Sequence, residues 1–97
     1  MIYEVTLHVR RDIADTFLAW LREHIVRILA LPGFEDAELH AVQSDGDDRC
    51  WCVRYRLLDQ AALDAYLRDH AARMRADGIA RFGDAFRAER RILLPLA

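Results

Sequence analysis

Histidine and aromatic side chains are the residues of this chain whose types and spacing suggest chemistry. His24 follows Trp20 by one helical turn, on the inward side of a predicted helix. Because an imidazole changes its charge near neutral pH, His24 is a candidate acid, base or haem ligand in a pocket between helix and sheet. The competing interpretation is a partly buried, hydrogen-bonded histidine with no catalytic role.

A second group of candidates would bind a ligand rather than react with it. Six aromatic residues have strand or helix spacings that turn them inward, namely Tyr3, Trp20, Trp51, Tyr55, Phe82 and Phe86. Such side chains can line a pocket for a flat ligand, but rows of this kind are more often ordinary core. His70 lies near Tyr66 on a second predicted helix and is a further candidate ligand-binding residue. A histidine at a helix edge is its simpler interpretation.

The sequence gives little support for a metal site, a phosphate-binding loop or a serine triad. Cys50 and Cys52 would share the polar face of the sheet with His8 and His40, and thiolate and imidazole are good zinc ligands. However, Cys-x-Cys along an extended strand spaces the sulfurs awkwardly and no second cysteine pair follows, so we predict no metal site. The four glycines are scattered rather than grouped in a phosphate loop, and the one serine, Ser44, lies in a predicted turn. A serine triad is therefore not expected.

The composition bounds the class of protein and its partners. The chain has 97 residues, 54% of them hydrophobic and 31% charged, which predicts one domain over residues 1–97 with a real core. Its net charge of -2 lacks the basic surplus of a nucleic-acid binder. No apolar run approaches the ~20 residues of a membrane helix. All 14 cationic residues are arginine, which we interpret as the base composition of a GC-rich bacterium.

The two cysteines also indicate the cellular compartment of the protein. Cys50 and Cys52 are one residue apart in a predicted strand, so both side chains point to the same face, a poor geometry for a mutual disulfide. We therefore expect free thiols and a cytoplasmic protein.

The elements that must position these residues follow from the hydrophobic periodicity. Alternation predicts strands over residues 2–10, 34–43, 50–57 and 86–93, with a hairpin turn at 44–48. A first helix runs from Ile13, capped by Asp12, to a stop at Pro32 and Gly33. A second runs from its cap at Asp59 to about residue 75, with Gly78 as its end and a further short helical turn at 79–82. The order β-α-β-β-α-β predicts the ferredoxin-like α+β fold, with a four-stranded antiparallel sheet in the order 4-1-3-2 and both helices on one face.

The alternation also predicts two unlike faces of this sheet. Apolar rows turn toward the helices, namely Tyr3, Val5, Leu7 and Val9 in one strand and Trp51, Val53, Tyr55 and Leu57 in another. The opposite face carries both charge signs, which would suit solvent or an isologous dimer of two sheets packed face to face. Its predicted members are Glu4, Thr6, His8, Arg10, Glu38, His40, Cys50, Cys52, Arg54, Arg56, Arg87, Glu89 and Arg91.

Several segments together resemble a bacterial family known as domain of unknown function 4286. They are residues 1–6, 17–25, 31–34 and 67–86, and the Trp-x-x-x-His and Arg-Phe-Gly-Asp pieces are the most specific. The family often has a proline where this chain has Val26, so the first helix is expected to run on smoothly. The family is similar to the dimeric α/β-barrel superfamily, and this resemblance implies a homodimer through the polar sheet face.

Three functions remain open after this resemblance. The first is an uncharacterised homodimeric domain that binds a small ligand in the helix–sheet cleft. The second is a cofactor-independent monooxygenase or isomerase of an aromatic substrate, with His24 as base or polariser, and the third is haem binding through His24 or His70. An enzyme or a ligand binder of this kind requires a cavity of roughly 300 Å³ or more between helix and sheet, which His24 reaches.

Overall fold

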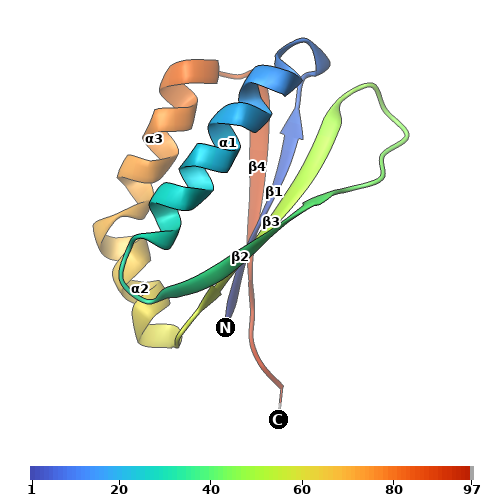
Figure 1. The fold of residues 1–97 in the computed structure, drawn as a ribbon. Helices are drawn as coiled ribbons and strands as arrows, with labels where there is room; N and C mark the ends of the chain where they lie inside the picture. The colour runs from blue at the N-terminus through green and yellow to red at the C-terminus, as the bar shows by residue number, and fades with distance from the viewer. Residues whose placement is uncertain (97) are drawn as a thin grey trace.

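The chain folds into a four-stranded antiparallel sheet with its helices on one side (Figure 1). The computed structural model describes residues 1–96. The elements follow in the order β1 (Ile2–Val9), the 3₁₀ turn η1 (Arg11–Ile13), α1 (Ala14–Leu29), β2 (Phe34–Ala41), β3 (Arg49–Leu57), α2 (Gln60–Asp69), α3 (Ala71–Phe82) and β4 (Phe86–Leu93). The ferredoxin-like fold class predicted from the alternation is thereby confirmed.

The strand order β2-β3-β1-β4 equals the predicted order. β1 lies in the interior of the sheet and pairs with β3 on one side and β4 on the other. Tyr3 lies opposite Tyr55 of β3 and Ile92 of β4, so these three side chains share the helix-facing side. The two edges of the sheet are β2 and β4.

The core lies between this side of the sheet and the helices. Both predicted apolar rows are buried in it. Phe17 of α1 is fully buried and packs against four aromatic rings, with centroid distances between 4.9 and 6.2 Å, namely Trp20, Trp51, Phe82 and Phe86. Aromatic pairs at these distances contribute about 0.5–1.5 kcal/mol each beyond their buried area. This cluster joins α1, α3, β3 and β4 into one body.

Two predicted helix boundaries are wrong, each for a local reason. Asp12 does not cap the first helix, because its carboxylate instead accepts a hydrogen bond from Arg10 Nε at 2.6 Å. Gly78 does not end the second helix but lies inside α3, which continues to Phe82. The residue that follows Phe82 is Gly83, whose φ of +56° favours glycine.

The predicted second helix is also divided in two. Its cap is confirmed, since Asp59 Oδ1 accepts a hydrogen bond from the Ala62 amide at 2.9 Å. The helix then breaks at His70, whose φ of -131° is not helical, and α3 starts afresh at Ala71. None of the α-helices of residues 1–96 combines the length and the hydropathy of a transmembrane segment.

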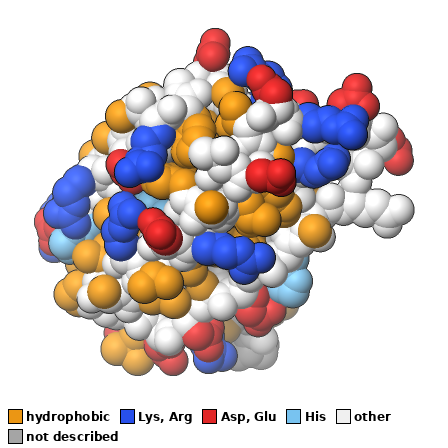
Figure 2. Space-filling view, turned by 45° about the horizontal axis from the view of Figure 1, so that its top comes forward, with side chains coloured by type: hydrophobic (Ala, Val, Ile, Leu, Met, Phe, Trp, Pro, Cys, Tyr) orange, Lys and Arg blue, Asp and Glu red, His pale blue; other side chains and the backbone are white. Residues whose placement is uncertain are grey.

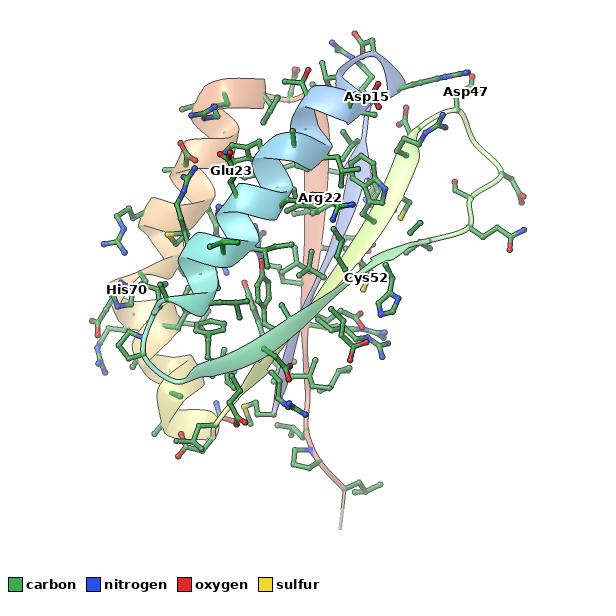
Figure 3. The ribbon with its side chains drawn as sticks, in the orientation of Figure 1. Asp15, Arg22, Glu23, Asp47, Cys52 and His70 are labelled. Atoms are coloured by element: carbon green, nitrogen blue, oxygen red, sulfur yellow. The ribbon has the colours of Figure 1, made fainter. Side chains whose placement is uncertain are left out.

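The outer face of the sheet carries a network of ion pairs. Glu4, at its centre, is only 3% exposed and accepts hydrogen bonds from Arg54 Nε at 2.7 Å and Arg91 Nε at 2.5 Å. Hydrogen bonds from these two guanidinium groups hold the pKa of the Glu4 carboxyl below its usual value, against the opposing effect of burial. Cys50 and Cys52 are both free, and Figure 3 shows Cys52 on the side of the sheet away from the helices.

Candidate functional site

A cavity of about 240 Å³ lies between α1, α3 and the helix-facing side of the sheet. Helix α1 lines it with Trp20, Leu21, His24 and Ile28, and α3 lines it with Met74, Arg75, Gly78 and Ile79. The sheet, α2 and the residue after α3 add Tyr3, Val5, Leu7, Val53, Tyr55, Tyr66, Gly83, Phe86, Arg87, Ala88 and Arg90. The volume falls somewhat short of the roughly 300 Å³ expected from the sequence, but His24 lines the cavity as that expectation requires.

Gly78 allows the two helices to approach each other beside this cavity. A Cβ atom on Gly78 would lie 2.9 Å from Trp20 Cη2 and 3.4 Å from Phe86 Cζ. Any larger residue would therefore need the space that the Trp20 ring occupies. The glycine that the sequence suggests as a helix end is instead a contact point between α3 and α1.

His24 is half-buried and stacks on Trp20, with ring centroids 4.5 Å apart and an interplanar angle of 24°. Its Nδ1 atom is buried and has no hydrogen-bond partner among residues 1–96. Burial lowers the pKa of His24 to about 4, while the charge of Asp77 opposes this shift. A buried nitrogen without a partner costs less free energy when it carries a lone pair than when it carries a proton that must be donated. We therefore assign the neutral tautomer of His24 that is protonated on Nε2.

Trp20 is held from the other side by Asp77. Its Nε1 donates a hydrogen bond of 2.9 Å to Asp77 Oδ2. Arg27 and Arg81 lie 3.3 and 3.6 Å from the same carboxylate. The hydrogen bond from Trp20 and the charges of these two arginines lower the pKa of Asp77. This contact fixes the indole ring, and through the stacking it positions the His24 ring.

Three tyrosines form the opposite part of the lining. The Tyr3 ring lies 6.2 Å from Tyr55 and 5.8 Å from Tyr66, centroid to centroid. Burial raises the pKa of Tyr66 to about 12 and raises the pKa of Tyr55 further, so both phenols are neutral at physiological pH. Arg75 Nη2 donates to the Tyr3 hydroxyl at 2.9 Å. The cavity thus combines apolar walls with neutral phenols and a guanidinium group.

The structure brings together five of the eight residues singled out in the sequence. The cavity is lined by Tyr3, Trp20, His24, Tyr55 and Phe86, whereas Phe82 packs against Phe17 in the core. Trp51 does not line the cavity either, since it packs into the core against Phe17 with ring planes 17° apart.

His70 is also absent from the cavity lining. It lies at the break between α2 and α3, on the outer side of the helices in Figure 3. Its Nδ1 is 2.9 Å from Arg73 Nη2. Within residues 1–96, no three His, Cys, Asp or Glu side chains gather closely enough to hold a metal ion.

Three contributors were not singled out as site residues. Tyr66 is visible in the sequence as part of an inward helical stripe, and Arg90 is visible as the residue that alternates with the outward Arg87, Glu89 and Arg91. Arg75 had no such signal, because its contact with Tyr3 joins positions 72 residues apart.

Comparison with known families and structures agrees with this fold. The model of one family, the domain of unknown function DUF4286, matches residues 1–95. The chain belongs to the DUF4286 family. A search of curated protein sequences gives no match.

Solved structures share the fold of this DUF4286 domain at low sequence identity. A variant of SnoaB, a cofactor-independent oxygenase from Streptomyces nogalater, has a TM-score of 0.69 at 14% identity, over 97% of this chain and 91% of that one. A dimeric ferredoxin-like protein from an uncultured marine organism has a TM-score of 0.66 at 14% identity, over 99% and 96%. A dimeric ferredoxin-like protein of unknown function from Jannaschia sp. CCS1 has a TM-score of 0.53 at 20% identity, over 96% and 100%.

Proposed function

We propose that this protein binds a compact, largely aromatic ligand in the cavity between α1, α3 and the sheet. The observation that carries the proposal is the cavity itself, which has a volume of about 240 Å³. Its walls are apolar and aromatic, and a few polar groups converge on it, as in most small-molecule sites. The volume favours a ligand smaller than a drug-sized molecule.

A cavity-filling variant tests this proposal. Ala88 lines the cavity from β4, opposite Leu7, whereas Ala80 is exposed on α3 and does not line it. Indole, a neutral aromatic probe, is titrated into the protein by calorimetry, and saturable binding is expected. Ala88→Leu should abolish the binding and Ala80→Leu should preserve it. Binding that survives in both variants, or is absent from the parent protein, contradicts the proposal.

A second candidate function is cofactor-independent oxygenation or isomerisation of the bound aromatic compound. The likeness of the fold to SnoaB and the presence of His24 on the cavity support it. In this function a neutral His24 would polarise the substrate by donating a hydrogen bond, because a group with a pKa of about 4 is a weak base at neutral pH. Oxygen uptake with 1-naphthol and no added cofactor, lost in His24→Gln, would support it. Uptake no faster than in buffer rejects oxygenation of this probe.

Haem binding is the least supported of the three functions. The cavity is smaller than the pockets of drug-sized ligands, and a porphyrin is larger than such ligands. His70 lies beside Arg73 rather than on the cavity. A haemin titration with no shift of the Soret band at micromolar protein is the expected result.

We also infer a homodimer through the outer sheet face and a cytoplasmic location. Neighbours described as dimeric ferredoxin-like proteins support the first inference. The two free cysteines, Cys50 and Cys52, support the second, because reducing compartments keep thiols unpaired. Cell fractionation tests the location, and a protein found in an oxidising compartment would contradict it.

A further inference from the structure

Three arginines line the cavity, and within residues 1–96 no acidic side chain does. One of the three, Arg87, pairs with Glu89 at 2.5 Å, so two are left without a carboxylate partner. Arg75 extends from α3 and Arg90 from β4. Neither guanidinium group lies within 4.0 Å of a carboxylate of residues 1–96. On the face of the molecule drawn in Figure 2, by contrast, blue and red side chains often stand next to one another.

Arg75 is half-buried with part of its hydrogen-bonding capacity unused. Its Nη2 donates to the Tyr3 hydroxyl at 2.9 Å, but its Nε is buried and has no partner. A guanidinium group has five N–H donors and accepts nothing, so only an acceptor can satisfy those that remain. A buried donor without a partner costs free energy, which an incoming acceptor would recover.

Arg90 is a charged residue in a row that otherwise faces the helices. It lies opposite Val5, and its neighbours in the same row are Ala88 and Ile92. The side chain is exposed and lines the cavity, so it stands at the solvent side of the opening. Its positive charge acts on the other polar groups of the site: it adds to the lowering of the His24 pKa by burial, and it opposes the rise that burial causes in the pKa values of Tyr55 and Tyr66.

The charge of the cavity is therefore positive in an otherwise slightly acidic protein. At neutral pH the imidazole of His24 and the phenols of Tyr55 and Tyr66 are uncharged, whereas the guanidinium groups of Arg75 and Arg90 are charged. The chain as a whole has a net charge of -2, so it offers no general attraction for anions. A preference for anions would have to come from the cavity.

We infer that the ligand is a compact aromatic carboxylate whose carboxylate group pairs with Arg75 and Arg90 while its ring lies among the aromatic side chains. This inference rests on the proposed function and adds the chemical class of the ligand. A carboxylate fits because its two coplanar oxygens match the fork of a guanidinium group. The carboxylate of the ligand would then lie beside the two arginines, and its ring would lie against the apolar walls of the cavity.

Benzoate and benzamide form a matched pair for the test, since they have nearly the same shape and differ in charge. Both are titrated into the protein at pH 7 and low salt by calorimetry. Benzoate is expected to bind about tenfold more tightly than benzamide. Arg90→Gln should remove most of this preference by weakening benzoate alone. Arg22→Gln is the control, because Arg22 is exposed on α1 and does not line the cavity.

The outcomes separate this inference from the proposed function. If benzamide and indole bind as tightly as benzoate, the cavity binds ligands but does not select anions, and the inference is overturned. If benzoate is preferred equally by Arg90→Gln and Arg22→Gln, the preference does not come from the cavity, which also overturns it. If none of the three probes binds, the proposed function fails and the inference fails with it.

Discussion

The residue that most defines the site is His24, and its protonation state limits its role. Burial beside Trp20 lowers its pKa to about 4, and the charges of Arg27 and Arg90 act in the same direction, against Asp77. The imidazole is consequently neutral at physiological pH. It can donate a hydrogen bond to a ligand but is a weak proton acceptor there.

This depressed pKa predicts an acid-sensitive contribution to stability. The unfolded chain binds a proton on His24 near pH 6.5 and the folded chain only near pH 4, so stability is lost as pH falls between these values. His24→Gln should lose less stability than the parent between pH 7 and pH 4.5 in urea unfolding. Ala80→Gln, at an exposed position of α3, should behave like the parent because it changes no titratable group. Equal pH dependence in all three proteins would show that His24 is not buried as described.

At the residue scale, the sequence indicates which side chains turn inward but not what they meet. Helical spacing predicts that His24 and Trp20 share a face, whereas Arg90 was not singled out although it alternates with outward neighbours along β4. The partner of Trp20 is Asp77, 57 residues away, and no local pattern carries such a contact. The unpartnered Nδ1 of His24 depends on the same tertiary packing.

At the element scale, the contact between α3 and α1 at Gly78 makes a prediction opposite to helix propensity. Alanine is favoured over glycine by about 1 kcal/mol in an open helix. Gly78→Ala should nevertheless lower the free energy of unfolding by about 1–3 kcal/mol, because its Cβ would meet the Trp20 ring at 2.9 Å. Thermal or urea unfolding measures the change. The control Ala80→Gly, at an exposed position of the same helix, should cost about 1 kcal/mol. A stabilised Gly78→Ala protein would contradict the described packing.

Two aspartates at helix starts form a second matched pair. Asp59 accepts a hydrogen bond from the Ala62 amide, so Asp59→Ala should destabilise the protein by about 1 kcal/mol. Asp12 binds the exposed Arg10 side chain instead of a helix amide, so Asp12→Ala should change stability little. Unfolding curves of the two variants compare them directly. The reverse order of effects would mean that the first helix is capped after all.

Element boundaries explain where sequence patterns succeed and fail. The strand over residues 86–93 is found as predicted, because a strand is defined by its own alternation. The end of the second helix is misplaced, because a glycine signals both a helix stop and a close contact. Only the position of Trp20 distinguishes these two uses of Gly78.

At the scale of the whole molecule, the inferred dimer gives a direct prediction of mass. Light scattering should give twice the chain mass of 11.3 kDa at tens of micromolar protein. Thr6→Arg, on the outer face between His8 and Glu4, should shift the mass toward one chain, whereas Ala72→Arg on the exposed side of α3 should not. A parent protein with the mass of one chain would remove the face-to-face arrangement.

The topology of the whole molecule follows from the sequence, but the cavity does not. The order of periodic segments and the handedness of crossovers restrict the sheet to the observed strand order. Whether Tyr3 and Tyr55 line a cavity or fill a core depends on the volume that their neighbours leave free, and pocket and core have the same composition. The cavity became evident only from the packing of α1 and α3 over the sheet.

Binding of an aromatic probe beside Trp20 and His24 is the central claim, and nuclear magnetic resonance tests it most directly. The Nε1–H of Trp20 and the ring protons of His24 give separate signals, and both rings line the cavity. Titration with indole and with benzoate should shift both signals saturably in the parent protein and in Ala80→Leu, but not in Ala88→Leu. Signals of Trp20 and His24 that stay unmoved at millimolar concentrations of both probes would contradict the account.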